Sequence, residues 1–400
     1  MELKCHWAMA AVNYKNKDRI CMCPRQHSTL SSISNSVRPT DFFNNVNFTR
    51  VRKQLFAGEW PDECKSCKQY EDKGYKSYRQ KSIGDKWSDD LLKYYDEETG
   101  EISNKLLEYV EVRFSNACNL SCLHCSPEWS SKWQSILRNV DVNKQDIDYG
   151  IHNLVEDANN QSWSLEQVDL LTHDLIHNCP NLKYIDVAGG EPLYQKQFWR
   201  FLENMQSHPN VGNIKLICIS NFNTPVNYEK LSKLFLKFNK SKIRISVDGG
   251  KNIYNYFRSG TYDNIVKNIQ VFKERNNKTI VEATNTISIY QLLDIENVLD
   301  DMLDLPVNNL HHSFVQYPEY LGLSVIPNKQ KILDKLEKYN TVSMPGLQKM
   351  IKDIRYLIEN TACDSKNQKR FIYYTNRMDQ IKNRKFEDVY GATVEEIING

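Results

Sequence analysis

Three cysteines stand close together near residue 120 of the chain, as Cys118, Cys122 and Cys125. Their C-x3-C-x2-C spacing puts three thiolates on one short loop. Such a loop can hold three of the four irons of a 4Fe–4S cube, which leaves the fourth iron open to a chelating ligand. Structural zinc is the alternative, but zinc sites commonly pair two C-x2-C knuckles into four closed ligands. The spacing therefore favours an iron–sulfur centre.

A second group of cysteines lies upstream of this loop. Cys64 and Cys67 form a C-x2-C pair, and Cys5, Cys21 and Cys23 precede them. Cysteines at such short spacings in a reducing compartment indicate metal or cluster ligation. These five cysteines are enough to supply the four ligands of a second centre, and on spacing alone a zinc ribbon stays open as the alternative.

The elements that must position these residues follow from the hydrophobic pattern. From about residue 107 onward, short apolar strands alternate with amphipathic helices. The expected strands cover residues 109–114, 182–187, 213–220, 242–247, 279–287 and 310–315. This alternation predicts an α/β fold, a parallel sheet curled into a partial (β/α)6 barrel of the TIM type. Because ligands bind at the carboxyl ends of such strands, the first cysteine loop falls at the ligand-binding edge.

The rest of the chain suggests three further segments. Residues 1–85 are rich in cysteine and lack a regular pattern, and residues 86–106 form a charged connector. The barrel is expected over residues 107–320. Residues 321–400 are mostly helical and charged, so we expect a helical C-terminal extension.

Composition excludes several classes of function. The chain has 400 residues and a net charge of +2, which gives no electrostatic case for binding nucleic acid or anionic lipid. No run approaches the ~18 apolar residues that a membrane span needs, and no apolar segment typical of a signal peptide follows Met1. We therefore expect a cytoplasmic protein without a membrane or nucleic-acid partner.

The cysteine loop resembles the signature of the radical S-adenosylmethionine (radical SAM) superfamily, in which an aromatic residue commonly stands where this chain has His124. Further motifs that resemble those of the superfamily follow successive expected strands. They are Gly189-Gly190-Glu191-Pro192, Ser220-Asn221, Ser246-Val247-Asp248-Gly249 and the later Arg258. One departure stands out, since Phe222 occupies the position where the superfamily often has glycine after Ser-Asn.

The resemblance implies a cofactor and a role for each matched motif. S-adenosylmethionine would chelate the open iron, and Gly189 and Gly190 would let the backbone approach its amino group. Glu191 would fix the turn or accept a hydrogen bond from the ammonium, and Arg258 would pair with the carboxylate. The ribose or carboxylate would be held by Ser220, Asn221 and Ser246. The reduced cluster would then cleave the cofactor to a 5′-deoxyadenosyl radical that takes a hydrogen atom from a substrate.

The N-terminal cysteines resemble the SPASM/twitch module, which binds an auxiliary iron–sulfur cluster. The implied ligands are Cys5, Cys23, Cys64 and Cys67, with Cys21 as the competitor for Cys23. In most relatives this module follows the barrel, whereas here it precedes it.

The resemblance implies an enzyme, and peptide or protein modification is the favoured class. Radical modification of a nucleotide, sugar or cofactor precursor is the alternative, and a non-catalytic, zinc-binding barrel protein is a second one. A radical enzyme of this kind needs an electron donor such as flavodoxin or ferredoxin.

Overall fold

The computed structural model describes residues 3–16, 19–26, 29–33, 36–72, 74, 76–81, 89–155, 162–238, 240–315, 317–326 and 328–399. The chain divides into two compact units. The first unit comprises Met1–Ser115, Asn160–Cys218 and Lys233–Ser241. The second unit comprises Asn116–Asn159, Ile219–Ser232 and Lys242–Gly400.

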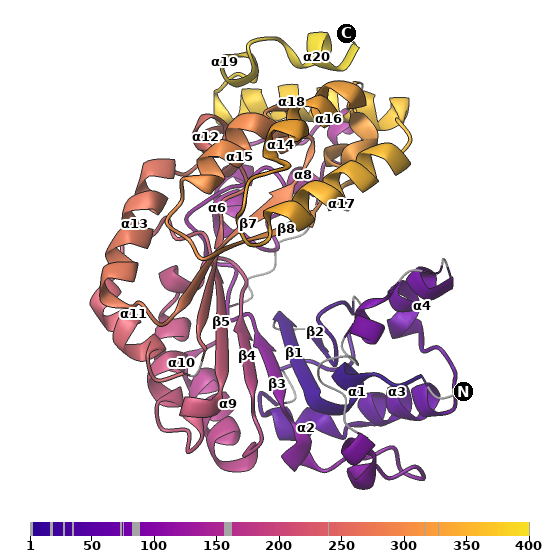
Figure 1. Ribbon diagram of the computed structural model, residues 1–400. Helices are drawn as coiled ribbons and strands as arrows, with labels where there is room; N and C mark the ends of the chain where they lie inside the picture. Colours follow the sequence, from indigo (N-terminus) through magenta and orange to yellow (C-terminus); the bar gives the residue numbers. More distant parts are fainter. Residues whose placement is uncertain are drawn as a thin grey trace. The chain divides into compact units, whose positions relative to one another are not determined.

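Eight strands share one sheet in the order β2-β1-β3-β4-β5-β6-β7-β8. Those that begin in the first unit are β1 (Ala11–Asn16), β2 (Arg19–Cys21), β3 (Tyr109–Val112), β4 (Tyr184–Val187) and β5 (Lys215–Ser220). β1 runs parallel to β3, β3 to β4 and β4 to β5, whereas β2 pairs with β1 in the antiparallel sense (Figure 1). The register places Ala11 opposite Tyr109 and Tyr109 opposite Tyr184.

Strand β1 corrects the expectation that residues 1–85 are irregular. All six of its residues are buried, and Tyr14 packs edge-on against Trp163, with ring centres 5.3 Å apart. Two of these buried positions carry the polar side chains of Asn13 and Lys15, and Lys15 forms an ion pair with Glu111. Polar residues at these buried positions hide the strand pattern in the sequence, because a buried strand is expected to be apolar.

Helices surround the strands of the first unit. They are α1 (His6–Ala10), α2 (Pro39–Phe43), α3 (Val46–Phe56), α4 (Lys65–Asp72), α9 (Leu165–Asn178) and α10 (Lys196–Met205). Helix α9 begins with a complete capping box between Ser164 and Gln167. It buries Val168, Leu171 and Leu175, which recur at helical spacing.

The second unit contains β6 (Lys242–Ser246), β7 (Ile280–Ile287) and β8 (Asn309–Phe314), with β6 parallel to β7 and β7 parallel to β8. Its helices before and between these strands are α6 (Ser131–Leu137), α7 (Lys144–Asp148), α8 (His152–Val155), α12 (Lys251–Arg258), α13 (Tyr262–Arg275), α14 (Ile289–Leu293) and α15 (Ile295–Leu303). Helix α11 (Tyr228–Phe235) begins in the second unit and ends in the first.

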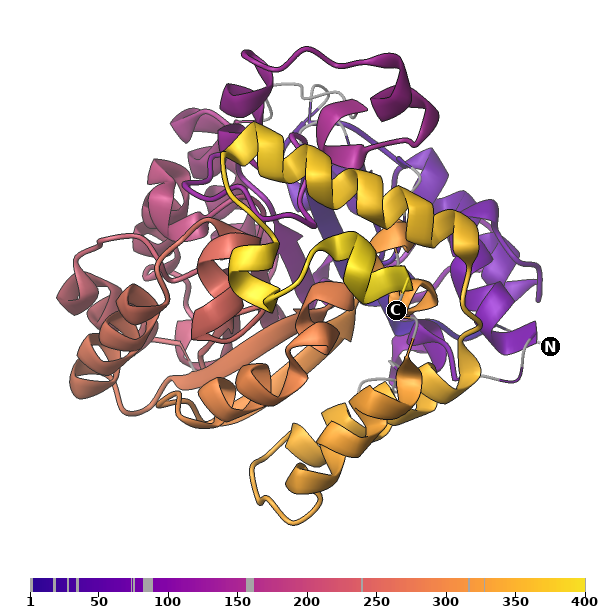
Figure 2. The same ribbon diagram turned by 90° about the horizontal axis from the view of Figure 1, so that it is seen from above.

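The C-terminal part of the second unit is helical, as expected. It consists of α16 (Lys329–Leu336), α17 (Leu347–Asn360), α18 (Ser365–Lys382), α19 (Glu387–Tyr390) and α20 (Val394–Asn399). Figure 2 shows α18 as a long yellow helix, against which α20 packs. None of the helices in the described stretches combines the length and the apolar character that crossing a bilayer requires.

The six strands expected from the sequence are β3 to β8, and helices follow each of them, so the predicted parallel α/β class is confirmed. The expected domain boundaries stay predictions, and the one between residues 85 and 86 lies outside the described residues.

Candidate functional site

The cysteine loop, residues 118–125, lies in the second unit and leads toward helix α6. Ser130 caps this helix: its hydroxyl accepts a hydrogen bond from the backbone N–H of Trp133 (3.4 Å) and donates one to the carbonyl of Leu120 (2.6 Å). The indole N–H of Trp133 donates to the carbonyl of Cys122 (2.9 Å). Side chains of the following helix therefore fix the backbone of the loop, and the thiols are not needed for that purpose.

The three thiols of the loop lie close enough to influence one another. Burial raises the pKa of the Cys125 thiol well above its usual value, and Cys122 and Cys118 raise it further. The Sγ atom of Cys122 lies 3.8 Å from the carbonyl oxygen of Arg258. Within the described residues, no group of three or more Cys, His, Asp or Glu side chains forms a ready-made site for a metal ion.

A buried ion pair stands beside the loop. Arg258, at the end of α12, donates a hydrogen bond to the carboxylate of Asp248, which follows β6. The other oxygen of Asp248 accepts from the backbone N–H of Thr286 on β7. His124 places its Nε2 atom 3.8 Å from the Asp248 carboxylate and stacks on Phe257, with ring centres 5.1 Å apart. Asp248 and Arg258, both expected to bind the cofactor, therefore lie next to His124 of the cysteine loop.

These groups differ in charge. Burial opposes the positive charge of Arg258, but Cys122 and Asp248 hold the pKa of its guanidinium well above the usual value. Burial lowers the pKa of His124, and the nearby Asp248 offsets this only in part. Arg258 is therefore a fixed cation next to the cysteine loop, and such a guanidinium can bind a carboxylate.

A tight turn follows β5 and contacts the loop. The side-chain amide of Asn221 donates to Asn119 (2.9 Å) and lies 4.0 Å from the Sγ atom of Cys118. The hydroxyl of Ser220 accepts from the backbone N–H of Phe222 (2.9 Å). Phe222 has a φ of 53°, the left-handed region that glycine adopts freely. The backbone of the turn thus keeps the glycine-like conformation although the residue is a phenylalanine.

No sequence pattern predicts that helix α18 contacts the cysteine loop. The hydroxyl of Tyr374 donates to the carbonyl of Leu123 (2.5 Å). The ammonium of Lys382 donates to the carbonyl of Ser121 and to the hydroxyl of Ser259, the latter at 2.9 Å. These residues lie more than 240 positions after the loop and match no motif, so only the three-dimensional structure associates them with it.

The Gly-Gly-Glu-Pro motif lies in the first unit, after β4. Gly189 has a φ of 83°, and a Cβ atom there would come within 2.7 Å of the Cβ of Arg113, so the position requires glycine. The buried carboxylate of Glu191 accepts from the backbone N–H of Leu193 (3.0 Å) and so caps the short helix that begins at Pro192. Glu191 thus fixes the turn.

The expected site residues fall into the two units as follows. The second unit holds Cys118, Cys122, Cys125, His124, Ser220, Asn221, Ser246, Asp248 and Arg258. The first unit holds Gly189, Gly190, Glu191, Pro192 and the cysteines at positions 5, 21, 23, 64 and 67.

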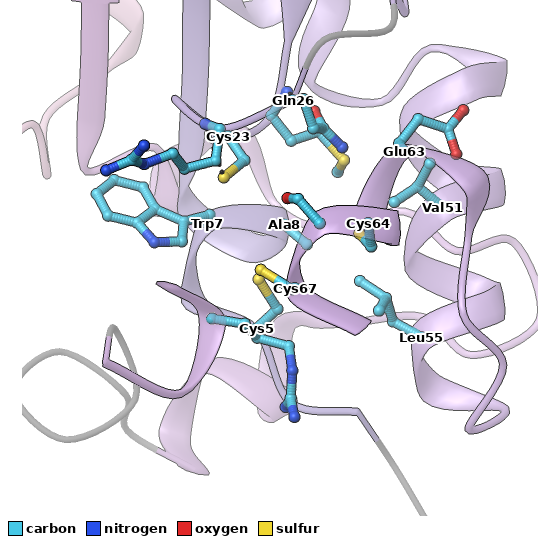
Figure 3. Close-up of a pocket in the computed structure, with 14 residues that line it drawn as sticks. Cys5, Trp7, Ala8, Cys23, Gln26, Val51, Leu55, Glu63, Cys64 and Cys67 are labelled. Carbon is cyan, nitrogen blue, oxygen red and sulfur yellow. Dashed lines mark hydrogen bonds between the residues drawn. The ribbon is translucent and has the colours of Figure 1, made fainter. Parts of the chain in front are cut away.

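The N-terminal cysteines of the first unit gather around a pocket. Figure 3 shows Cys5, Cys23, Cys64 and Cys67 lining it together with apolar side chains such as Leu55. Burial raises the pKa of the Cys5 thiol to about 11, with a further upward contribution from Cys67. Four cysteines from three segments of the chain therefore meet in one partly apolar cavity.

Cys21 does not line this pocket. Its thiol is buried and points toward backbone carbonyls, those of Cys23 (3.3 Å) and Asn13 (3.8 Å). Burial raises its pKa to about 11. All eleven cysteines of the chain are free of disulfide bonds.

A buried ion pair supports the C-x2-C helix. The carboxylate of Glu71, near the end of α4, accepts from the hydroxyl of Ser77 and from the guanidinium of Arg79, both at 2.6 Å. Arg79 also donates to the carbonyl of Lys4 (2.6 Å), next to Cys5. This arginine ties the two segments that carry Cys5 and the C-x2-C pair.

Comparison with protein families identifies one match. Residues 112–290 match the family described as the Radical SAM superfamily. No curated protein sequence matches the chain.

Several solved structures share part of the architecture. Native anSMEcpe with bound AdoMet is 16% identical, with a TM-score of 0.41, and the match covers 64% of this chain and 63% of that one. Streptococcus suis SuiB bound to precursor peptide SuiA is 14% identical, with a TM-score of 0.38 and coverage of 64% and 48%. The radical S-adenosylmethionine methyltransferase TsrM from Kitasatospora setae, with cobalamin and a [4Fe-4S] cluster bound, is 11% identical, with a TM-score of 0.34 and coverage of 51% and 36%. The chain thus spans less than two thirds of the length of each of these proteins.

Proposed function

Because residues 112–290 match the Radical SAM superfamily, we propose that this chain cleaves S-adenosylmethionine reductively at a 4Fe–4S cluster bound by Cys118, Cys122 and Cys125. The observation that carries the proposal is the construction of the cysteine loop. Its backbone is fixed by Ser130, Trp133 and helix α18, so the thiols are available as ligands. When bound, the cluster and S-adenosylmethionine would together supply a one-electron C–S cleavage and a radical that takes hydrogen from the substrate.

The residues around the loop suit the methionine end of that cofactor. Arg258 is a buried cation beside the loop and would hold the carboxylate of the cofactor. Asp248 fixes the guanidinium by a buried hydrogen bond, and Thr286 fixes Asp248 in turn. Asn221 and Ser220, in the turn after β5, would bind the ribose or the carboxylate. These residues of the chain would thus bind and orient the cofactor and exclude water from it.

A second iron–sulfur cluster would occupy the N-terminal pocket, with Cys5, Cys23, Cys64 and Cys67 as its ligands. Four cysteines that line one cavity match the ligand number of a closed 4Fe–4S or 2Fe–2S centre. The wall of the pocket includes Arg25 and Arg79, whose positive charges would balance the negative charge of a bound cluster.

We place the substrate among peptides and proteins, with a flavodoxin or ferredoxin as the electron donor and the cytoplasm as the compartment. Resemblance of the N-terminal cysteines to the SPASM/twitch module supports the class of substrate, and the free thiols are compatible with a reducing compartment.

Anaerobic reconstitution tests the proposal. The protein should be brown, hold roughly eight irons per chain (roughly six if the N-terminal centre is 2Fe–2S) and release 5′-deoxyadenosine from S-adenosylmethionine after reduction. A variant with Cys118, Cys122 and Cys125 changed to alanine should lose that release and keep the iron of the N-terminal pocket. Colourless protein with stoichiometric zinc would overturn the proposal in favour of a zinc-binding barrel.

A further inference from the structure

The strands of the second unit present a polar face, of which only Ser246 and Thr286 belong to the proposed cofactor site. β6, β7 and β8 alternate between apolar side chains buried against the helices and polar, partly exposed ones on the opposite face. The register aligns the polar residues in rows across the sheet. They are Lys242, Arg244 and Ser246 on β6, Glu282, Thr284 and Thr286 on β7, and Asn309, His311 and Ser313 on β8.

One buried carboxylate organises this face. Glu282, whose side chain is 4% exposed, accepts from Lys242 (2.6 Å) and Asn309 (3.0 Å) on one oxygen and from Nε of Arg244 (3.0 Å) on the other. A single negative charge therefore meets two positive charges. The cluster keeps an excess of one positive charge, and Glu282 holds both cations in place.

Hydrogen-bond donors remain open beside that excess charge. Arg244 is 27% exposed, and within the described part of the chain its two terminal NH2 groups have no hydrogen-bond partner. The same holds among the described residues for the hydroxyl of Thr284 and for Nδ1 of His311, two polar atoms shielded from solvent. Thr284 and His311 face each other across β7 and β8, one row above Glu282. Buried polar groups without partners are costly unless a ligand completes them.

We propose that the face formed by Arg244, Thr284 and His311 binds a carboxylate group of the substrate. The inference rests on the proposed radical chemistry, because β6 carries Arg244 and the chain reaches Asp248 two residues after β6 ends. Four residues of chain span at most about 13 Å, which puts the bound carboxylate within one small molecule's length of the cofactor residues. The two terminal NH2 groups of Arg244 lie in one plane and can donate to both oxygens of a carboxylate.

The charge of the site favours a carboxylate over a phosphate. A carboxylate brings one negative charge, which equals the excess left by Glu282, Lys242 and Arg244. Burial, with Arg244 as the next contributor, lowers the pKa of His311 to about 4, so its imidazole is neutral at pH 7 and adds a hydrogen bond without adding charge. A phosphate dianion would leave the site with an uncompensated negative charge. An acidic side chain or a chain terminus of a peptide carries the matching group.

Short peptides can separate these ligand sources. Reconstituted full-length protein would be titrated by calorimetry with Ac-Ala-Glu-Ala-NH2, Ac-Ala-Gln-Ala-OH, Ac-Ala-Gln-Ala-NH2 and inorganic phosphate. The first peptide carries a side-chain carboxylate, the second a terminal carboxylate and the third none. We expect millimolar binding of at least one acidic peptide, about tenfold tighter than that of the neutral peptide. Equal binding of acidic and neutral peptides, absence of binding, or tighter binding of phosphate would overturn the proposal.

Three variants locate the site. Arg244→Gln removes the open guanidinium, and Thr284→Val keeps the shape of the side chain but removes the hydroxyl. Both should reduce the preference for the acidic peptide, Arg244→Gln to less than about twofold. Arg275→Gln, an exposed arginine on α13, is the matched control and should keep the full preference. A preference that survives Arg244→Gln in folded protein would place the carboxylate elsewhere.

Binding is measured without reduction, so it is independent of radical chemistry. Release of 5′-deoxyadenosine from each variant reports separately on the proposed function. If that release is absent in the wild-type protein while the acidic preference is present, the proposed function fails and the carboxylate site stands.

Discussion

The Nζ atom of Lys382 lies 4.4 Å from the centre of the Trp133 ring, which stacks a cation from the C-terminal helix α18 on the helix that follows the cysteine loop. The same ammonium donates to the hydroxyl of Ser121 (3.0 Å), next to Cys122. Burial lowers the pKa of Lys382 well below its usual value, Arg384 lowers it further, and negative charge on Cys122 and Cys125 counteracts both. A bound, negatively charged cluster would thus favour the protonated lysine.

Replacing Lys382 by methionine should lower the reduction potential of the cluster in the cysteine loop. Reduction adds negative charge, and the variant removes a nearby positive charge that stabilises it, so we expect a shift of about −60 mV, tenfold in the one-electron equilibrium constant. A redox titration followed by electron paramagnetic resonance measures it. Lys385→Met, which removes a 69% exposed lysine three residues later, is the control and should leave the potential unchanged. Equal potentials in the two variants would mean that Lys382 acts only on packing.

Cys23 and Cys21 should differ in their effect on the iron of the N-terminal pocket. Cys23 lines the pocket with Cys5, Cys64 and Cys67, whereas Cys21 points toward backbone carbonyls. Cys23→Ser should therefore lose most of the auxiliary iron, roughly four atoms per chain for a 4Fe–4S centre, and Cys21→Ser should keep it. Iron analysis of both variants, in protein that also lacks the three cysteines of the loop, isolates the effect. Iron loss in Cys21→Ser alone would assign Cys21 as the ligand.

The backbone conformation at Phe222 predicts that a glycine substitution there destabilises the protein less than an alanine substitution does. Phe222 is fully buried against Tyr228 and Phe272, and its backbone φ is 53°. Removing the ring costs about 3–5 kcal/mol in either variant, but alanine keeps a conformational penalty of about 1 kcal/mol that glycine avoids. The free energy of unfolding in urea should therefore be higher for Phe222→Gly than for Phe222→Ala. At positions with negative φ, alanine is usually more stabilising than glycine. A lower free energy of unfolding for Phe222→Gly than for Phe222→Ala would therefore contradict the left-handed backbone conformation at this position.

The sequence predicts the sheet from β3 to β8 well, because each of those strands is either an apolar run or an alternation of apolar and polar residues, and amphipathic helices separate them. It also predicts that Asn221 and Asp248 lie near the cysteine loop, since each follows a strand of one parallel sheet, whereas Arg258 was named by the resemblance alone and lies at the end of helix α12. β1 was missed because two of its buried positions carry the polar residues Asn13 and Lys15, and the ion-pair partner of Lys15 lies on β3, far away in sequence.

The role of the C-terminal extension could not be predicted for a related reason. Lys382 and Tyr374 lie in a charged helix whose composition is typical of a solvated surface. Packing of α18 against the rest of the second unit positions Lys382 and Tyr374 near the cysteine loop. A single sequence contains no signal for such a contact. The carboxylate site has the same origin, because Arg244, Thr284 and His311 become neighbours only through strand register.

The polar face of β6 to β8 should make the stability of the protein sensitive to acid. Burial and Arg244 lower the pKa of His311 to about 4, so between its usual value of 6.5 and pH 4 the unfolded chain binds a proton that the folded chain refuses. Although burial raises the pKa of Glu282, hydrogen bonds from Lys242, Asn309 and Arg244 bring it to about 2, below its usual 4.5. In both cases the unfolded state binds more protons. The free energy of unfolding should therefore fall as the pH drops from 6.5, first through His311 and then, below 4.5, through Glu282.

His311→Gln separates the first of these contributions from the rest of the protein. The variant should lose less stability than the wild-type protein between pH 6.5 and pH 4.5, because glutamine does not titrate. The measurement is the free energy of unfolding in urea at several pH values in that window, taken as a difference between variant and wild type so that other titrating groups cancel.

His312→Gln is the matched control: burial lowers the pKa of His312 too, but its ring pairs with Asp353 at 2.9 Å on the opposite face of β8. It should reduce the pH dependence less than His311→Gln, because an imidazolium paired with a carboxylate is penalised less by folding. Identical pH dependence in wild type and His311→Gln would show that His311 accepts its proton as readily in the folded state, and the site would then carry an extra positive charge below pH 6.5.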